Sequence, residues 1–319
     1  MEDAKEQKQE IWVLFQDLSK AYDRVNIFML KKAMQRLKLP IAFIDLIENI
    51  FIERKNRVFT EVGLTDPYNM LDQGEVISPL LRCIYYDPLL CKIEQQELGY
   101  NIVHQYRPNI YDRHADYNCI TVGDLAFMDD TTWITETKES LEEILKIADD
   151  FYNLNNIKVN KEKSELLVNI PDEPYIYDHP ITLKFGRERI RITPKKHKES
   201  ARILDVWVNL DGDRKFVIQQ CKNEVIRVAN ILKRKPLTDK QLLYLWNMVV
   251  IPRLEYRSQL MMLKRSDCDN IVSHFRKIFK NKLHLAITAP NAIFENTLIY
   301  NFQDFYEVQK QSKITNFFI

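Results

Sequence analysis

The 319-residue sequence is poor in the residues that mark several common classes of protein. Glycine occurs only six times, so no glycine-rich loop that could cradle a phosphate is expected. The five cysteines are odd in number, widely spaced and without a C-x-x-C pair, which argues against a disulfide scaffold or a cysteine zinc site. The six histidines also lack the spacing of metal ligands.

Long hydrophobic runs are absent as well. No apolar run approaches the ~18 residues that a membrane span needs. The N-terminus, Met1-Glu2-Asp3-Ala4-Lys5, is charged and lacks the apolar core of a signal peptide. We therefore expect an intracellular protein in a reducing compartment, neither secreted nor bound to a membrane, with nucleus and cytoplasm equally compatible.

The small net charge of +1 hides an asymmetry between the two parts of the chain. Residues 1–180 hold 20 Lys and Arg against 32 Asp and Glu, a net charge of −12. Residues 181–319 hold 26 against 13, a net charge of +13. An ordinary solvated surface explains many charge runs, but segregation on this scale favours a polyanion held by the basic part.

The hydrophobic pattern predicts a mixture of strands and helices, and hence an α+β fold. A continuous apolar run predicts a buried strand at residues 11–15, with Asp17 just past its end. A turn marked by Gly74 leads into a helix that carries Pro79 in its first turn and extends to about residue 93. Residues 120–134 predict a hairpin with its turn at Asp129-Asp130.

Further along, a capping box at Ser140 predicts a helix over residues 140–154. Strict alternation over residues 181–193 predicts one strand, with Arg187, Arg189 and Arg191 on a basic face. A second capping box begins at Thr238, and Pro252 interrupts the helical pattern that follows. We expect two domains, residues 1–212 and a mostly helical domain over residues 213–319.

Three carboxylates, Asp17, Asp129 and Asp130, end apolar segments. Carboxylates in such places are costly unless something compensates them, and a divalent metal is a common partner. An Asp-Asp pair in a turn is often nothing more than a turn. Together with Asp17, however, the pair forms a candidate metal site.

Four motifs in order resemble motifs A, B, C and D of reverse transcriptases, most closely those of non-LTR (LINE-type) retrotransposons. The residues that carry the resemblance are Phe15-x-Asp17-x-x-Lys20-Ala21-Tyr22-Asp23, Gln73-Gly74-x-x-x-Ser78-Pro79-Leu80, Phe127-Met128-Asp129-Asp130 and Asn160-x-x-Lys163-Ser164. The similarity extends from the first residues to about residue 260. It implies a polymerase palm, an antiparallel sheet with packed helices, followed by a thumb-like helical domain.

The resemblance also implies an activity, an RNA-directed DNA polymerase that adds dNTPs to a primer 3′-hydroxyl on an RNA template. Asp17 and Asp129, with Asp130 beside them, would hold two Mg²⁺ ions, for which Mn²⁺ can substitute. Lys163 matches the lysine proposed to protonate the leaving pyrophosphate, although a solvated lysine is an equal alternative. No role in binding a membrane is implied.

The substrate-binding residues follow from the same motifs. The backbone carbonyl of Leu18 would face a metal, and Tyr22 would be the steric gate that excludes a ribose 2′-hydroxyl. Gln73 and Gly74 would line the nucleotide pocket, while Ser78 and Pro79 would start the helix that supports the template.

The motif E position and the basic residues before it concern the primer and the template. Leu204-Asp205-Val206-Trp207 lies where the family has a Leu-Gly-Val primer grip, and Asp205 replaces the glycine. The basic residues are expected to contact phosphates without sequence preference. They are Lys184, Arg187, Arg189, Arg191, Lys195, Lys196, Lys198 and Arg202, with Lys233-Arg234-Lys235 further on.

Only 16 residues precede Asp17, where family members place a much longer fingers subdomain. The resemblance therefore implies a domain truncated before motif A, with its fingers missing or supplied by another chain. The alternative to a polymerase is a catalytically silent remnant of a retroelement, which binds nucleic acid through its basic half.

Overall fold

The computed structural model describes residues 1–19, 25–52, 57, 59–61, 63–64, 76–106, 116–171 and 174–318. The chain forms two compact units, unit 1 (Met1–Lys196) and unit 2 (His197–Ile319), each with its own hydrophobic core. Among the helices in these residues, none is long and apolar enough to cross a bilayer. The fold is a mixture of antiparallel sheets and packed helices, as the sequence predicts.

Unit 1 contains the larger sheet and five helices among its described residues. In chain order its elements are α1 (Glu2–Glu6), β1 (Ile11–Ser19), α2 (Ile27–Arg36), α3 (Ile41–Ile52), β2 (Phe59–Thr60), β3 (Gly63–Leu64), α4 (Ser78–Glu94), β4 (Tyr100–Tyr106), β5 (Asp116–Val122), β6 (Asp124–Phe127), β7 (Asp130–Thr135), α5 (Lys138–Leu154), β8 (Lys158–Asn169), the 3₁₀ turn η1 (Pro174–Asp178), β9 (Ile181–Phe185) and β10 (Glu188–Ile192).

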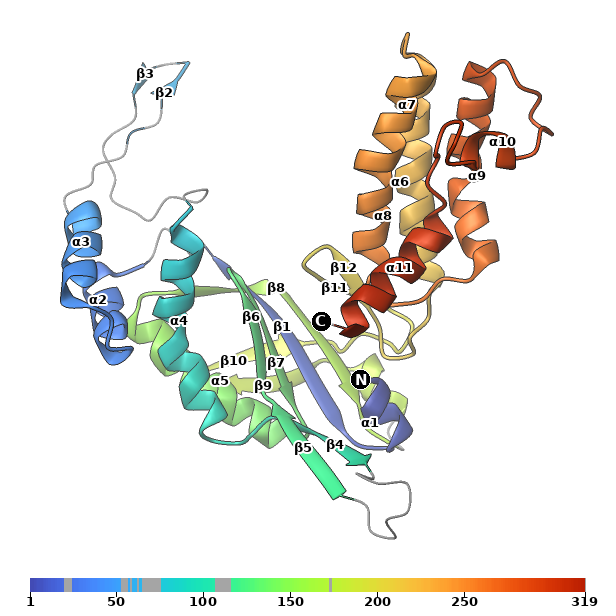
Figure 1. Ribbon diagram of the computed structural model, residues 1–319. Helices are drawn as coiled ribbons and strands as arrows, with labels where there is room; N and C mark the ends of the chain where they lie inside the picture. Colours follow the sequence, from blue (N-terminus) through green and yellow to red (C-terminus); the bar gives the residue numbers. More distant parts are fainter. Residues whose placement is uncertain are drawn as a thin grey trace. The chain divides into compact units, whose positions relative to one another are not determined.

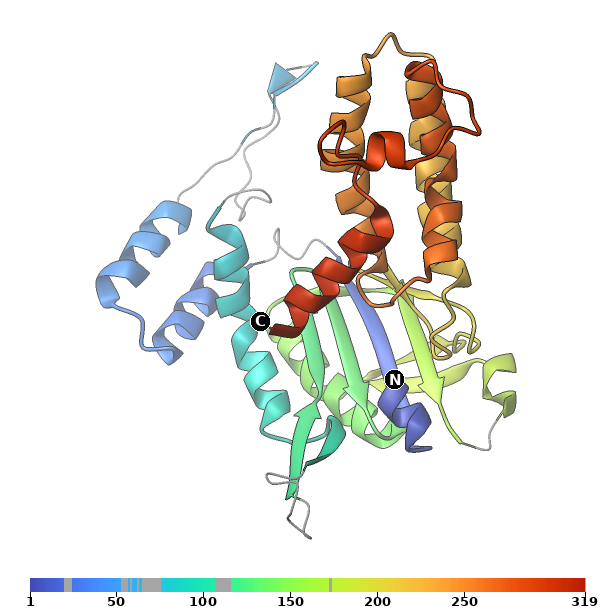
Figure 2. The same cartoon turned by 45° about the vertical axis from the view of Figure 1, so that its right-hand side comes forward.

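A four-stranded antiparallel sheet in the order β6-β7-β1-β8 forms the centre of unit 1. Helices α4 and α5 lie against one face of it (Figures 1 and 2). The predicted apolar run supplies the centre of β1, where Leu14 is fully buried against Trp133 of β7 and neighbouring core residues. In α5 the expected stripe of Leu141, Ile144 and Leu145 is likewise buried.

Two local predictions for unit 1 are corrected. Helix α5 begins earlier than expected, because the side chain of Thr137, not that of Ser140, accepts the capping hydrogen bond, from the Ser140 amide at 3.1 Å. The single strand expected over residues 181–193 is a hairpin, β9 and β10, which turns at Gly186. Gly186 has a φ of +55°, and a Cβ there would collide with the Asp149 carboxylate of α5.

Unit 2 consists of one short hairpin and a group of helices. Its elements are β11 (Ala201–Ile203), β12 (Val206–Val208), α6 (Lys215–Lys233), α7 (Asp239–Leu245), the π-helical turn η2 (Trp246–Val250), α8 (Ile251–Ser258), α9 (Arg265–Lys282), α10 (Ala292–Glu295) and α11 (Phe305–Phe318). The helices pack around an aromatic cluster in which Trp246 stacks on Phe302 with ring centroids 4.8 Å apart.

Two sequence features of unit 2 have clear structural counterparts. The predicted capping box at Thr238 is present, with Gln241 as its reciprocal partner. Pro252 falls in the first turn of α8, and the π-helical turn before it joins α7 to α8 (Figure 1). A π turn widens the helix locally, and this shift in hydrogen bonding accommodates a residue that has no amide donor.

The compact units divide after Lys196, earlier than the domain boundary predicted near residue 213. The physical reason lies in the β11–β12 hairpin, whose Leu204 carbonyl accepts a 2.6 Å hydrogen bond from the Tyr256 hydroxyl of α8. Trp207 of β12 also lies 5.9 Å from Phe216 of α6, measured between ring centroids. The hairpin therefore packs with the helices that follow it.

Candidate active site

The ends of β1 and β7 bring together the aspartates of two distant motifs. Asp17 does not follow the strand, as predicted, but lies inside β1, because pairing with β8 continues this strand to Ser19. It lies directly opposite Asp130 in the antiparallel register of β1 and β7. The backbone amide of Leu18 donates a 3.0 Å hydrogen bond to the carbonyl oxygen of Asp129. Asp17, Asp129 and Asp130 therefore share one corner of the sheet.

The alternation of side chains along these strands decides which face each aspartate takes. Gln16 and Thr131, opposite each other, are 2% and 1% exposed on the face that the helices cover. Their neighbours Asp17 and Asp130 take the other face and are only partly buried. The carboxylates of these two residues thus lie on the face away from α4 and α5 and remain partly accessible to solvent.

The turn between β6 and β7 differs by one residue from the prediction. It consists of Met128 and Asp129, and Asp130 is already the first residue of β7. Met128 has a φ of +54°, a left-handed conformation that is uncommon for residues with a side chain. The Nε atom of Arg82, in α4, donates to the Met128 carbonyl oxygen at 3.4 Å. Sequence reasoning missed Arg82; its signal is an arginine inside an apolar stretch.

An irregularity in β8 brings Lys163 to Asp17. Phe15 pairs with Glu165 and Asp17 pairs with Asn160, so β8 has extra residues opposite Gln16. Such bulges re-aim side chains and are frequent beside active sites. The Lys163 Nζ atom lies 3.1 Å from Oδ2 of Asp17, and the Asn160 Nδ2 atom lies 3.5 Å from the same oxygen. The motif D residues therefore contact the motif A aspartate.

The carboxylate oxygens at this corner are the type of ligand that a hard cation such as Mg²⁺ binds. Mg²⁺ prefers oxygen ligands and is commonly held by one or two carboxylates together with substrate phosphates. Among the described residues, no group of three or more His, Cys, Asp or Glu side chains is placed to hold a metal ion. The corner offers carboxylates from two strand ends, and the remaining ligands would have to come from the backbone, water or substrate.

Several predicted substrate-binding residues lie outside the described part of the chain, namely Tyr22, Gln73 and Gly74. Ser78 and Pro79 are described, and they occupy the first turn of α4 as expected. Ser78 is fully buried. The motif B helix therefore begins at the predicted residue.

The predicted basic residues of unit 1 belong to the β9–β10 hairpin and to the segment after it. Arg187 is in the turn, and Arg189 and Arg191 lie on the exposed face of β10, opposite the buried Ile190 and Ile192. Lys195 is 2.9 Å from a carboxylate oxygen of Glu165, and Lys196 is 3.2 Å from one of Asp178. The arginines of β10 are therefore more accessible to a polyanion than Lys195.

Asp205 sits in the tight turn between β11 and β12. Leu204 and Asp205 have φ angles of +48° and +62°, both in the left-handed region. Glycine is favoured there, and aspartate tolerates the conformation better than most residues. Arg202 also contacts the Asp205 carboxylate. The turn of the predicted primer grip is thus formed without glycine, and its negative charge has a partner.

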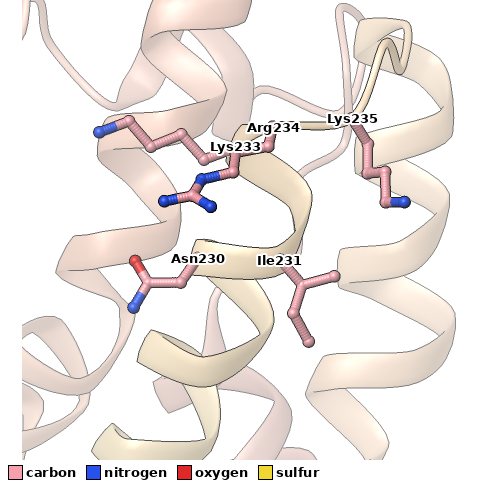
Figure 3. A pocket seen from close by; sticks show the side chains of 5 residues that line it. All are labelled: Asn230, Ile231, Lys233, Arg234 and Lys235. Carbon is pink, nitrogen blue, oxygen red and sulfur yellow. The ribbon is translucent and has the colours of Figure 1, made fainter.

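The other predicted basic group, Lys233, Arg234 and Lys235, ends α6 in unit 2. These residues line a hollow of about 740 Å³ together with Asn230 and Ile231 (Figure 3). The Lys235 side chain points away from those of Lys233 and Arg234. Because the cations spread apart, they favour an extended anionic surface over a single bound anion.

Asp124, in β6, is a titratable residue of unit 1 that the motifs do not include. Desolvation by burial, and then the charge of Glu94, raise the pKa of the Asp124 carboxyl from 3.8 to about 6. Its position four residues before Met128 places it near the opposite end of β6 from the turn. Asp124 therefore has a raised pKa but is not part of the carboxylate corner.

Comparisons with known proteins agree with the motif assignment. Residues 1–208 match the family described as "Reverse transcriptase (RNA-dependent DNA polymerase)". A Nasonia vitripennis protein, "Retrovirus-related Pol polyprotein from type-1 retrotransposable element R2", is 23% identical over 295 residues. The match covers 89% of this chain and 26% of that protein, so the chain spans about a quarter of its length.

Solved structures of telomerases are also similar to this chain. The telomerase of Candida tropicalis, in complex with the TWJ fragment of telomeric RNA, has a TM-score of 0.39 and 14% identity, over 98% of this chain and 46% of that one. The corresponding complex from Candida albicans has a TM-score of 0.36 and 10% identity, over 97% and 52%. By the family match over residues 1–208, this chain belongs to the reverse transcriptase (RNA-dependent DNA polymerase) family.

Proposed function

We propose that this chain is the palm and thumb-like part of an RNA-directed DNA polymerase of retrotransposon origin. Its reaction adds dNTPs to the 3′-hydroxyl of a primer that is paired with an RNA template. The observation that carries the proposal is the corner of the sheet where Asp17 lies opposite Asp130. There the Leu18 amide also donates a hydrogen bond to the carbonyl oxygen of Asp129. A palm needs this arrangement, because its reaction takes place between carboxylates from two neighbouring strand ends.

Asp17 and Asp129 would hold the metal ions, with Asp130 beside them adding negative charge and, for one ion, an alternative carboxylate ligand. When bound, two Mg²⁺ ions activate the primer hydroxyl and stabilise the leaving pyrophosphate. The Asn160 side-chain amide donates a 3.5 Å hydrogen bond to the Asp17 carboxylate, which helps to orient it. Mn²⁺ would serve in place of Mg²⁺ because it takes the same oxygen ligands.

Lys163 has a second role in this proposal. Its ammonium is 3.1 Å from the Asp17 carboxylate, although the lysine side chain is 67% exposed. Lys163 and a cation held by Asp17 would compete for the same carboxylate oxygen, so the ammonium would be free to turn toward the substrate once the cation is bound. Lys163 would then donate a proton to the departing pyrophosphate as a general acid.

The remaining assignments rest on the motifs. Leu18 would present its backbone carbonyl to a metal, and Tyr22 would exclude nucleotides with a 2′-hydroxyl. Gln73 and Gly74 would contact the incoming dNTP, and the Ser78-Pro79 start of α4 would support the template. Arg187, Arg189 and Arg191 of the basic hairpin, with Lys195 and Lys196 after it, would contact phosphates of the nucleic acid.

Primer extension by the purified chain tests the proposal. The assay contains Mg²⁺, dNTPs and a DNA primer annealed to RNA, and it compares the wild type with Asp129→Asn. Asp150→Asn is the matched control, because Asp150 is an exposed carboxylate on α5 and belongs to none of the four motifs. We expect extension by the wild type and the control, and none by Asp129→Asn.

The test also separates the polymerase from a silent nucleic-acid binder. Binding of the primer–template that weakens steeply with salt, without extension in Mg²⁺ or Mn²⁺, would identify the binder and contradict the polymerase. Extension that Asp129→Asn retains would contradict the assignment of the carboxylate corner. Tyr22→Ala, for its part, should increase incorporation of ribonucleotides if Tyr22 is the gate.

A further inference from the structure

Arg82 is a buried cation directly beneath the turn that carries Asp129. Its side chain is 2% exposed, within the first half of α4. Burial of a guanidinium is costly without compensating partners. Its Nε atom donates to the Met128 carbonyl oxygen at 3.4 Å, whereas Nη1 and Nη2 have no hydrogen-bond partner in the described part of the chain.

Aromatic rings supply the other contacts of Arg82. The guanidinium carbon lies 4.5 Å from the centroid of the Tyr86 ring and 5.9 Å from that of Tyr85. Arginine stacks on aromatic faces in this way, and a lysine ammonium cannot present the same planar surface. The position therefore demands an arginine for its shape as well as for its charge.

Tyr86 connects this stack to the far side of the same turn. Its hydroxyl lies 3.2 Å from the Thr131 Oγ1 atom and is also hydrogen-bonded to the hydroxyl of Tyr152. Thr131 immediately follows Asp130 in β7, whereas Met128 immediately precedes Asp129. Arg82 and Tyr86 therefore hold the chain on both sides of the two aspartates.

The turn needs such support because of its backbone. Met128 occupies the left-handed region with a side chain present, a conformation that persists only where the surroundings enforce it. The Arg82 hydrogen bond ends on the carbonyl of this same residue. Loss of the bond would let the turn relax and displace the neighbouring Asp129 carboxylate.

We propose that Arg82 is a positioning residue that holds residues 128–131, through Met128 and Tyr86, in the conformation that binds the catalytic cations. The inference rests on the proposed function, since it assigns the cations to the same corner. Arg82 acts through the turn and does not itself touch the cation. A residue that only stabilised the core would leave the affinity for a cation unchanged in the folded protein.

Binding of Mn²⁺ alone, followed by electron paramagnetic resonance, gives a readout that does not depend on catalysis. We compare the wild type with Arg82→Met and Arg82→Lys in the full chain. Arg82→Met should weaken Mn²⁺ binding about tenfold, the lower range for loss of a group that orients a metal ligand. The Mn²⁺ affinity of Arg82→Lys should lie between those of the wild type and Arg82→Met, because lysine keeps the charge and loses the stacking on Tyr86. The Mg²⁺ concentration for half-maximal extension should rise in parallel, with the KM for dNTP unchanged.

A second buried arginine provides the matched control. Arg276 of unit 2 is 7% exposed and forms an ion pair with Asp269 at 2.7 Å. Arg276→Met should lower the Tm and leave Mn²⁺ binding as in the wild type. If Arg82→Met fails to fold, Tyr86→Phe carries the test, because it keeps the ring beneath the guanidinium and removes the hydroxyl next to Thr131. Its Mn²⁺ affinity should fall about threefold, a partial loss of the same support.

The outcomes separate this inference from the proposed function. Wild-type Mn²⁺ affinity in folded Arg82→Met, or in Tyr86→Phe where Arg82→Met does not fold, would overturn the role of Arg82 alone. A wild type whose Mn²⁺ binding is weak and identical to that of Asp129→Asn would overturn the carboxylate corner, and the role of Arg82 with it.

Discussion

Two carboxylates, Glu224 of unit 2 and Asp17 of unit 1, have very different surroundings. In unit 2, the Glu224 carboxylate is contacted by Arg227, Arg253 and Arg257 at 2.7, 3.1 and 3.5 Å. In unit 1, the described cation beside Asp17 is Lys163, whose side chain is mostly exposed. Unit 1 holds 33 acidic and 26 basic residues, whereas unit 2 holds 12 and 20, so the few carboxylates of unit 2 are outnumbered by cations.

The titration of two carboxyl groups reflects this difference. Hydrogen bonds from Arg227 and then Arg253 hold the pKa of Glu224 below its ordinary value, against the effect of burial. Burial beside Glu94 raises the pKa of Asp124 in unit 1 to about 6. A carboxylate with several arginines contributes to folding, whereas carboxylates with few cations cost stability and remain able to bind an added cation.

Substitution at the carboxylate corner should give the largest effect. Asp17→Asn keeps the shape of the side chain and removes its charge, so the single-turnover rate of primer extension should fall about a thousandfold, or ~4 kcal/mol of transition-state stabilisation. Glu224→Gln should extend primers at the wild-type rate at 20 °C. If Asp17→Asn lowers the single-turnover rate less than tenfold, Asp17 is not a metal ligand of the active site.

Glu224→Gln should instead affect folding, by roughly 2 kcal/mol at pH 7, less than for a fully buried pair because its arginines are partly exposed. The folded pKa of Glu224 lies below the unfolded value of 4.5, so its stabilisation is complete above that pH and is lost as the pH falls through the folded pKa. Thermal unfolding of both proteins from pH 7 to pH 3 measures this. A gap in Tm that stayed constant with pH would contradict the ionic origin.

The existence of β1 and the start of α4 were predictable because the local pattern determines them, whereas the end of β1 was not, since the strand continues past Asp17 to Ser19. The apolar run before Asp17 gives β1, and Pro79 marks the first turn of α4. The hairpin at Gly186 was not predictable in the same way, because alternation continues on both sides of a two-residue turn. Its turn glycine was the available signal, and its role depends on the contact with Asp149.

Contacts between distant segments could not be read from the sequence. The bulge in β8 that brings Lys163 to Asp17 depends on the register between two strands, which no local pattern reports. Arg82 is similar, since an arginine in an apolar stretch of a helix is usually expected to reach solvent. Its burial depends on Tyr86 and on the carbonyl of Met128, which the fold alone brings together.

Lys163→Ala sharpens the comparison by removing the cation next to Asp17. The rate of extension should fall about tenfold, which is less than the hundredfold or more that is typical for loss of a general acid. The Lys163 side chain is mostly exposed, so water can supply part of the proton transfer in its absence. Mn²⁺ binding should become slightly tighter, because the metal no longer competes with the ammonium for the Asp17 carboxylate. Lys138→Ala is the control, since Lys138 is paired with Glu142 of α5 at 3.8 Å. A fall in rate with weaker Mn²⁺ binding would show that Lys163 supports the metal site and does not compete with it.

The smallest effect, and one of opposite sign to that of Glu224→Gln, is expected from Asp124→Asn. The folded pKa of Asp124 is raised from 3.8 to about 6, so its charge destabilises the fold above pH 6 and has no effect below the unfolded pKa. Asp124→Asn should therefore increase the free energy of unfolding by about 1 kcal/mol at pH 7, a figure reduced for partial exposure. The gain should vanish as the pH falls to about 3.5, which thermal unfolding across this range measures. A loss of stability at pH 7 would mean that the Asp124 carboxylate has a favourable partner in the folded protein. Asp124 would then stabilise unit 1, as Glu224 stabilises unit 2.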